Sequence, residues 1–512
     1  MALHQVNNMV HSRDTGPSRG REARKGSSVA TAKITYLSAT ERAELVEQTF
    51  TVLEDVGVTF NTAEALDLLA EGGAIIDRET SSARLPRELV KRCLALAPGQ
   101  VLLAARDPRN DVLVGGGAPL SVTSGGTATY MLDDATGERR AGAADDLRTV
   151  MRLFDALPEI DYVWPTISAR DLDPVTANLE IEAISLRSCA KHVQDEVRSL
   201  EYVAPLLDML EAAAGAPMSE RPIFSTINCT IAPLSHDAEM TPASIALARA
   251  GVPIIIMPMP LMGTTAPLSA AGVTVITLAE IASAVVLFQL AAPGCPLIAA
   301  PEPALADLRS GLYLSAPPEI AFAALACIDV LKSWGLPVQG GSFGGDAKAA
   351  DFQDGLEGAF HGLLDSLCGA DTLVGPGELD GAQAVSLAAI VLHADATGML
   401  KQALQDTPFD SASMLLDDIR AVGPGGHYLA CRSTRERARD AWQPAVLRRG
   451  SFESHRGTTL VEDALARAHH LLATHEVLPM AADVERHIDS VIAGFAAANV
   501  QTIDRDPRRR TE

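Results

Sequence analysis

A polar stretch in the C-terminal half of the chain, Val338–Leu379, holds the residues best suited by type and spacing to chemistry. An extended apolar run breaks into the glycine-rich segment Gly340–Gly345, and four polar residues follow within ten positions: Ser342, Asp346, Lys348 and Asp351. A helical pattern and a second short apolar strand come next, and a glycine loop then ends in Glu378. This order indicates one βα unit of a parallel sheet, and in barrels the loops at the strand carboxyl ends carry the chemistry. A solvated surface loop is the alternative interpretation.

Polar side chains also follow other predicted strands. Asn228 comes after one apolar strand and Glu302 after another, while His427 and Tyr428 stand in a glycine-rich turn. Because the carboxyl ends of parallel strands meet at one mouth, we expect these groups to converge on a site. Taken singly, each of them is equally well explained as a capping or solvated residue.

The elements that must position these residues alternate between strand and helix at intervals of about 30 to 45 residues, the βα spacing of a parallel sheet. The pattern predicts an α/β fold, a (β/α)8 TIM-type barrel with an N-terminal α+β extension and C-terminal helices. Thr127–Leu132 is the expected first strand, and a strand near Gly426–Leu429 would complete the eight. An open doubly wound sheet is the alternative. The remaining predicted strands are Tyr162–Ile167, Ile223–Cys229, Pro253–Pro258, Pro296–Ala300, Pro337–Gly340 and Thr372–Val374.

The chain divides by composition into four predicted parts. Residues 1–33 are polar and indicate a disordered leader. Residues 34–110 indicate an α+β cap, in which Ser38 and Glu41 form a capping box and Pro86 opens a helix. The barrel is expected over 111–450, and a C-terminal helical extension over 451–512.

Composition excludes several partners. The formal net charge of −23 argues against nucleic acid, which needs a basic face. The seven cysteines are scattered singly, so neither a disulfide framework nor a zinc-thiolate site is indicated. There is no apolar signal core, and apolar stretches such as Val252–Pro260 are too short and too interrupted by proline to span a membrane. We expect a cytoplasmic protein.

Several common catalytic motifs are missing from the sequence. It contains no GxxxxGK[ST], no GxGxxG between a strand and a helix and no HExxH, whereas GxSxG is matched at Gly16–Gly20 and at Gly340–Gly344. His469 and His470 lie on a predicted helix without acidic partners at metal spacing and indicate a surface position. Phosphate-loop, dinucleotide and zinc-protease chemistries are therefore not indicated, and no metal site is expected.

A set of motifs spread from about Gly115 to Leu447 resembles the trimethylamine methyltransferase (MttB-type) family of corrinoid-dependent methyltransferases. No single motif is decisive, but their order and coverage are specific. The motifs are Gly125-Gly-Thr-Ala, Asp133-Asp-Ala-Thr-Gly-Glu-Arg-Arg, Asp146-Leu-Arg-Thr-Val-Met-Arg-Leu, Ala232-Pro-Leu-Ser-His-Asp-Ala-Glu-Met, Gly263-Thr-Thr-Ala-Pro-Leu, Gly375-Pro-Gly-Glu-Leu and Gly423-Pro-Gly-Gly-His-Tyr-Leu.

The resemblance implies a barrel that presents the methyl group of an amine to the cobalt(I) of a corrinoid (cobalamin) on a separate small protein. The chain lacks the DxHxxG cobalamin-ligand pattern, so no permanently bound cofactor is expected. The archaeal trimethylamine enzymes carry pyrrolysine in the region that corresponds to Ser342–Asp351, where this chain has ordinary residues. It therefore resembles the non-pyrrolysine branch, which includes enzymes acting on quaternary amines such as glycine betaine. Family analogy also suggests a homo-oligomer.

For a cationic substrate, carboxylates and aromatic faces are the expected binding groups. Two further hypotheses stay open: a barrel enzyme of another class, such as a lyase or hydrolase, and a non-catalytic amine-binding barrel. If the substrate carries a carboxylate, Lys348 or His427 could pair with it. From their strand-end positions we assign catalytic roles to Asp346, Glu378 and His427. We assign substrate binding to Tyr130, Trp164, Asn228, Glu302, Phe343, Lys348 and Tyr428.

Overall fold

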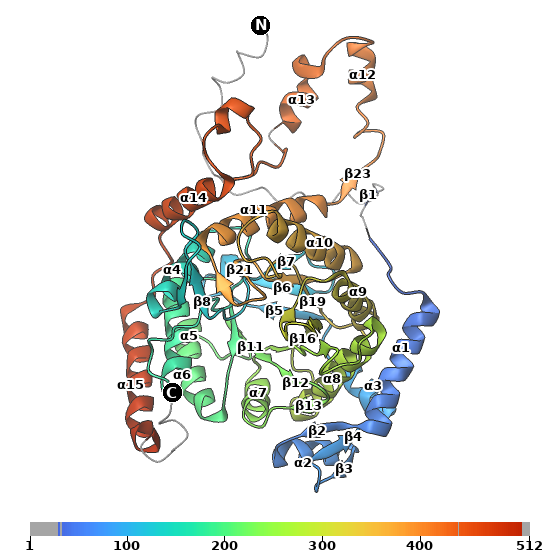
Figure 1. Ribbon diagram of the computed structural model, residues 1–512, viewed down its shortest axis with the longest axis vertical. Coiled ribbons are helices and arrows are strands. Elements are labelled where there is room, and N and C mark those ends of the chain that lie inside the picture. Colours follow the sequence, from blue (N-terminus) through green and yellow to red (C-terminus); the bar gives the residue numbers. More distant parts are fainter. Residues whose placement is uncertain (1–28, 31–32, 439, 504–512) are drawn as a thin grey trace. The chain divides into compact units, whose positions relative to one another are not determined.

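The computed structural model describes residues 29–30, 33–438 and 440–503, which fall into two compact units (Figure 1). The smaller unit comprises Gln405–Ala441 with the strand β1 (Val29–Ala30), and the larger unit comprises the other described residues. The predicted leader 1–33 lies almost entirely outside the described residues, as does the terminal segment 504–512.

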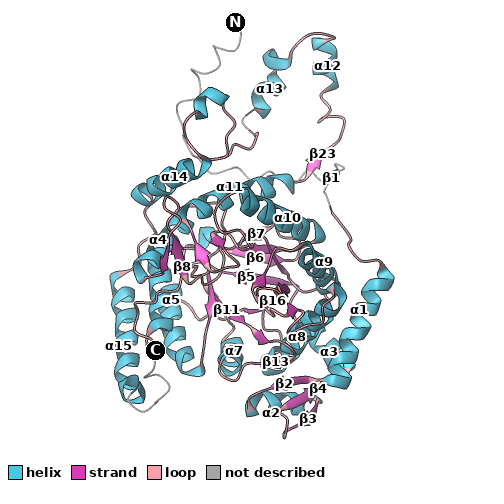
Figure 2. Ribbon diagram, viewed as in Figure 1, coloured by secondary structure: helices cyan, strands magenta, loops and turns pink. Residues whose placement is uncertain are grey.

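Eight parallel strands form a closed ring in the larger unit (Figure 2). Ladders join β10–β11–β14–β16 and β19–β20–β7, and three single parallel bridges complete the circle: Thr123–Tyr162, Val163–Val193 and Ala299–Val338. Because β20 pairs back with β7, the ring has no edge, which confirms the predicted barrel and excludes an open sheet. In chain order the strands are β7 (Ser121–Val122), residues 162–163, β10 (Val193–Glu196), β11 (Phe224–Asn228), β14 (Ile254–Ile256), β16 (Leu297–Ala299), β19 (Gln339–Gly341) and β20 (Thr372–Val374).

A helix follows each strand of the ring and covers its outside (Figure 2). The strands are buried on both faces, as the run Ile254–Ile256 shows, because the helices cover one face and the barrel interior the other. The helices are α4 (Ala144–Asp155), α5 (Ala177–Ser188), α6 (Val203–Ala214), α7 (Met240–Arg249), α8 (Ala270–Ala291), α9 (Pro318–Ser333), α10 (Phe352–Cys368) and α11 (Leu387–Ala403).

A hairpin of β5 (Gln100–Leu103) and β6 (Val112–Gly115) fills the amino-terminal end of the barrel. The backbone N–H of Ala104 donates to the carbonyl of Pro222, just before β11, and a Cβ on Gly115 would touch Pro337, just before β19. The apolar side chains of the hairpin share one buried cluster with the barrel interior: Val101, Leu103, Val114, Tyr162, Ile227, Ile255 and Ile298. Substrate access from this end is therefore blocked.

Two strand predictions are wrong. Thr127–Leu132 is not the first strand of the ring: Tyr130–Leu132 forms β8, which pairs with β9 (Arg139–Ala141) and β22 (Ala384–Val385) in a separate sheet. The segment does form a strand, but in this separate sheet. The first strand of the ring is instead the two-residue β7. No strand forms near Gly426–Leu429, where a 3-10 turn spans Tyr428–Ala430 after glycines with positive φ.

The helix α8 is long and apolar enough to cross a membrane, so the expectation that the apolar stretches are too short was wrong for this segment. It is the one such helix among the described residues, and 78% of its most apolar window is buried in the protein. It packs against α9 and against the N-terminal helices, as a core helix does.

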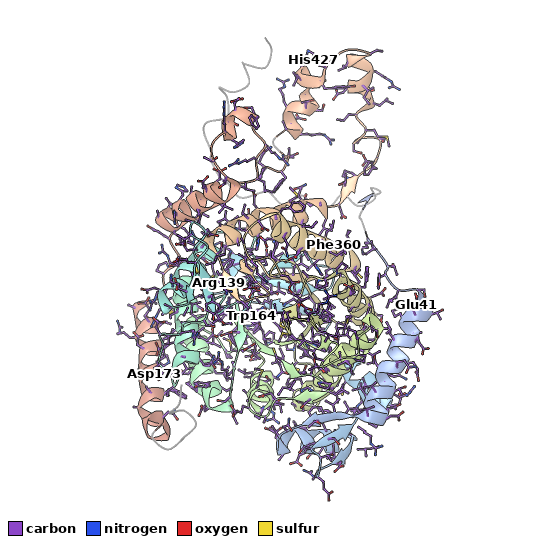
Figure 3. All side chains as sticks on the ribbon, in the orientation of Figure 1. Glu41, Arg139, Trp164, Asp173, Phe360 and His427 are labelled. Atoms are coloured by element: carbon purple, nitrogen blue, oxygen red, sulfur yellow. The ribbon has the colours of Figure 1, made fainter. Side chains whose placement is uncertain are left out.

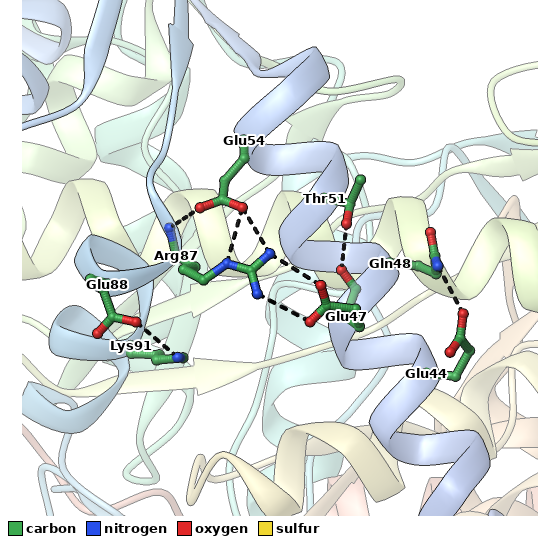
Figure 4. Close-up of polar contacts among 8 residues, drawn as sticks. All are labelled: Glu44, Glu47, Gln48, Thr51, Glu54, Arg87, Glu88 and Lys91. Atoms are coloured by element: carbon green, nitrogen blue, oxygen red, sulfur yellow. Dashed lines mark hydrogen bonds and ion pairs between the residues drawn. The ribbon is translucent and has the colours of Figure 1, made fainter.

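The N-terminal extension places α1 (Ala39–Thr51), α2 (Ala63–Gly72) and α3 (Arg87–Leu96) beside a small sheet that includes β2 (Val58–Phe60). The predicted capping box is present: Ser38 accepts from the N–H of Glu41, whose carboxylate accepts from the N–H of Ser38. Arg87, directly after Pro86, binds the carboxylates of Glu54 and Glu47 and joins α3 to the first helix (Figure 4).

Two C-terminal helices pack on the barrel, α14 (Leu460–Thr474) on α11 and α15 (Ala482–Ile503) on α6. Asp395 of α11 fixes the chain before them by accepting from the backbone N–H groups of Ala445, Val446 and Leu447. In the smaller unit, β23 (Thr407–Pro408) pairs with β1, followed by α12 (Leu416–Val422) and α13 (Arg432–Arg437).

Candidate active site

A cavity of about 510 Å³ lies at the carboxyl end of the barrel. Its walls come from the segments that follow every strand of the ring except β11, so side chains distant in sequence meet there. This is the end at which barrel enzymes place their chemistry. The wall residues that matter below are Gly126, Trp164, Glu196, Arg198, Glu302, Phe343, Asp365 and Glu378.

Four of the residues selected from the sequence line this cavity: Trp164, Glu302, Phe343 and Glu378. Figure 3 shows Trp164 inside the ring of helices. Two are aromatic and two are carboxylic, the combination expected for a cationic ligand. The others lie elsewhere.

Asp346 and Lys348 are occupied by local contacts. The Asp346 carboxylate accepts from the backbone N–H groups of Ser315 (3.0 Å) and Ala316 (3.3 Å) and so fixes the loop after β16. The Lys348 ammonium lies 2.6 Å from Asp380 and donates to the carbonyl of Asp346. Neither residue lines the cavity.

The remaining candidates are not among the residues that line the cavity. Asn228 is buried and donates to Ser244 of α7. Tyr130 lies in β8 under the guanidinium of Arg139, 5.1 Å from its ring centroid. His427 and Tyr428 belong to the smaller unit, and neither lines the cavity.

Three carboxyl groups of the cavity wall, which we call the carboxyl cluster, define its electrostatics: Glu302, Asp365 and Glu378. Burial raises the pKa of Glu302 to about 8, with the nearby Asp365 and Glu378 adding to the effect. Burial also raises the pKa of Glu378 to about 8 and that of Asp365 to about 7. One oxygen of each group has no hydrogen-bond partner among the described residues. A bound cation would therefore stabilise the ionised forms.

Asp365 was not identified from the sequence. Apolar residues at helical spacing normally mark the buried face of a helix, but in α10 they lie on the exposed face. Its apolar residues Phe352, Leu356 and Phe360 face outward and are exposed (Phe360 is marked in Figure 3). The buried face instead carries small and polar residues at helical spacing: Asp354, Gly358, His361, Gly362 and Asp365. This polar stripe was the signal that could have identified Asp365 and His361 as wall residues.

One glycine makes room for Glu378, and another allows the two glycine loops to touch. A Cβ on Gly125 would stand 2.2 Å from the Glu378 carboxyl carbon, and the neighbouring Gly126 donates its N–H to this carboxylate. Gly375 has φ 127°, and a Cβ there would stand 1.8 Å from the Phe343 carbonyl oxygen. The two glycine loops after β19 and β20 are thus in direct contact.

Buried polar contacts fix the two aromatic walls. The indole N–H of Trp164 donates to Asp195 (3.1 Å), and burial together with the neighbouring Asp195 raises the pKa of Glu182 well above its usual range. Phe343 stacks on His393 with centroids 4.1 Å apart. His393 accepts from the Gly377 N–H through Nδ1 and donates through Nε2 to Asp354 of α10.

The free energy of unfolding should fall as the pH rises from about 4 to about 8. In an unfolded chain the three carboxyl groups titrate near pKa values of about 4. In the folded protein the pKa values of these groups are about 7 to about 8. Between these limits the groups therefore stay protonated in the folded protein but are already ionised in the unfolded chain. The unfolded state then binds fewer protons, so stability falls with rising pH, and outside these limits the contribution is constant.

Melting temperatures recorded from about pH 5 to about pH 9 test this expectation. The difference between wild type and Glu302→Gln isolates one member of the carboxyl cluster, and the profile of the variant should be flatter. Parallel profiles for the two proteins would contradict the proton linkage.

The closed barrel and the acidic, aromatic cavity at its carboxyl end define an enzyme of the (β/α)8-barrel class. The chain matches the trimethylamine methyltransferase (MTTB) family over residues 12–497. It therefore belongs to this family and is a methyltransferase, which confirms the resemblance in its motifs.

The chain is similar to several individual proteins. Trimethylamine methyltransferase MttB of Methanosarcina barkeri (strain Fusaro / DSM 804) is 28% identical over 453 residues, covering 87% of this chain and 92% of that protein. Glycine betaine methyltransferase of Desulfitobacterium hafniense (strain Y51) is 28% identical over 473 residues, covering 91% and 97%. The crystal structure of the Methanosarcina barkeri monomethylamine methyltransferase (MtmB) aligns with a TM-score of 0.48 at 13% identity, covering 86% of this chain and 89% of that one.

Proposed function

We propose that this protein moves a methyl group from a quaternary methylammonium compound, bound in the cavity, to the reduced cobalt of a corrinoid on a separate small protein. The observation that supports the proposal most strongly is the carboxyl cluster, the buried Asp365 and Glu378 with the half-buried Glu302, each with an unpartnered oxygen, beside two aromatic walls. The names of the relatives, a trimethylamine and a glycine betaine methyltransferase, support the same class of substrate. A cytoplasmic location and a homo-oligomeric assembly are parts of the same proposal.

The cavity suits an organic cation better than a metal ion. Among the described residues, no three histidine, cysteine or acidic side chains are grouped closely enough to hold a metal. A quaternary ammonium ion has no N–H to donate, so it is recognised by diffuse charge attraction and by aromatic faces. Glu302, Asp365 and Glu378 supply the charge, and Trp164 and Phe343 the faces.

Three hydroxyl groups of the cavity wall are engaged in hydrogen bonds and are not set up as nucleophiles. Thr127, Ser315 and Ser342 each donate to a backbone carbonyl. Burial lowers the pKa of His361, and the neutral ring contacts the carbonyl of Ala316. A nucleophile supplied by a partner protein agrees with this arrangement.

The residues of this chain then have a limited task. A reduced corrinoid would supply the electron pair that displaces the amine from its methyl carbon. The carboxyl cluster would hold the ammonium centre, Trp164 and Phe343 would exclude water, and the fixed walls would orient one N-methyl group toward the mouth. The leaving group is a neutral amine, so no side chain has to protonate it.

The test combines purified protein, reduced cobalamin and a panel of methylamines, betaines and other N-methyl compounds, with and without a corrinoid protein. We expect loss of the visible absorbance of reduced cobalamin, together with formation of the demethylated amine, for one substrate group. Turnover without any corrinoid would favour a barrel enzyme of another class. Binding of an amine without loss of its methyl group, even with a corrinoid protein present, would favour a non-catalytic amine-binding barrel.

A further inference from the structure

Arg198 is the one lysine or arginine among the described residues that line the cavity. It stands two residues after the end of β10, at the carboxyl end of the barrel, and its side chain is exposed. All other charged wall residues are acidic. The cavity therefore combines buried negative groups with a single positive group open to solvent.

The backbone around Arg198 is fixed by hydrogen bonds, whereas its guanidinium acts on the neighbouring carboxyl groups of Asp195 and Glu196 only through its charge. Asn178 of α5 donates to the carbonyl of Glu196 (3.1 Å) and accepts from the N–H of Arg198 (3.5 Å). Within the described structure, the guanidinium makes no hydrogen bond or ion pair. Other arginines near this end are paired with carboxylates, Arg139 with Asp380 and Arg140 with Asp146.

A free guanidinium beside an acidic cavity has a specific chemical meaning. It disfavours a ligand that is only a cation, because like charges repel. It favours a ligand with an anionic end, since its planar donors match the two oxygens of a carboxylate. A ligand with both charges satisfies the carboxyl cluster at one end and Arg198 at the other.

We propose that Arg198 binds the carboxylate of the substrate, so that the enzyme selects a zwitterion, a quaternary ammonium compound that also carries a carboxylate. This inference rests on the proposed function for the ammonium end of the ligand. It replaces Lys348 and His427 as the partner expected for a substrate carboxylate, because Lys348 is paired with Asp380 and His427 does not line the cavity.

The experiment measures binding by titration calorimetry, independently of methyl transfer, with glycine betaine and with tetramethylammonium as probes. In Arg198→Gln we expect the Kd for glycine betaine to rise about 10- to 100-fold, the loss of one charged hydrogen-bonded contact. The Kd for tetramethylammonium should stay the same or fall, because a repulsive charge is gone. Arg198→Lys should retain part of the affinity for glycine betaine.

Arg309→Gln is the matched control, an exposed arginine in the loop after β16 that does not line the cavity, and both Kd values should remain unchanged. Equal weakening of both probes in Arg198→Gln, or no change in either, would overturn the inference. If Arg198→Gln weakens the binding of glycine betaine but not that of tetramethylammonium, and the wild-type protein still transfers no methyl group, only the proposed function is contradicted.

Discussion

Replacing Glu302 with glutamine should lower kcat/KM for a methylammonium substrate by about 100-fold while making the folded protein more stable above about pH 8. The activity falls because a charge that faces the cation is lost, an effect of a few kcal/mol in a desolvated site. The stability rises because the ionised Glu302 is repelled by Asp365 and Glu378, the two carboxyl groups that raise its pKa. Glutamine carries no charge, so this repulsion is absent in the variant. Steady-state kinetics and thermal melts at about pH 8.5 measure the two effects.

Asp307→Asn is a suitable control for this variant. Asp307 lies in the same loop after β16, but its carboxylate already accepts from Ser310 and from the N–H of Arg309. We expect kcat/KM to change by less than about 3-fold, as is usual for a surface position. A Glu302→Gln variant that keeps its activity would show that the cation is bound elsewhere.

Gly375→Ala should remove the site by unfolding its loops. The added methyl group would lie 1.8 Å from the Phe343 carbonyl oxygen, and φ 127° is a conformation that alanine rarely adopts. Overpacking and backbone strain together should cost about 2–6 kcal/mol in the free energy of unfolding. Urea titration followed by circular dichroism measures the loss.

Gly137→Ala separates the two causes. Gly137 also has a positive φ (73°), but no atom lies within 4 Å of a Cβ there. It should therefore show only the cost of backbone strain, about 1 kcal/mol. Equal destabilisation by the two variants would mean that the contact between the glycine loops contributes nothing.

The fold was predictable from the sequence because its repeating unit has a strong pattern. Buried strands such as Ile254–Ile256 are continuous apolar runs, and helices separate them at regular spacing. The first strand was not identified because β7 has only two residues, whereas the stronger β pattern of Thr127–Leu132 belongs to a strand outside the ring. Local propensity indicates that a strand forms but not which partner it pairs with.

The site was predictable only in part. Glu302 and Glu378 follow barrel strands directly, so strand-end position was enough to select them. Asp346 has the same kind of position, but backbone donors 30 residues away in sequence satisfy it, and a sequence does not show such contacts. Asp365 comes from the middle of a helix, where the apolar residues drew attention to the opposite face.

The hairpin β5–β6 also has a kinetic consequence. Under the proposed function, an amine and a protein-borne methyl acceptor would have to use the same mouth, because the amino-terminal end of the barrel is filled. A small amine fits within the cavity, whereas a docked protein covers the opening, so the amine has to enter first and its product leave last. Double-reciprocal plots of initial rate against amine concentration should therefore give intersecting lines at different acceptor concentrations, as in a compulsory-order ternary mechanism. Excess acceptor protein should inhibit, because it covers the mouth before the amine has bound.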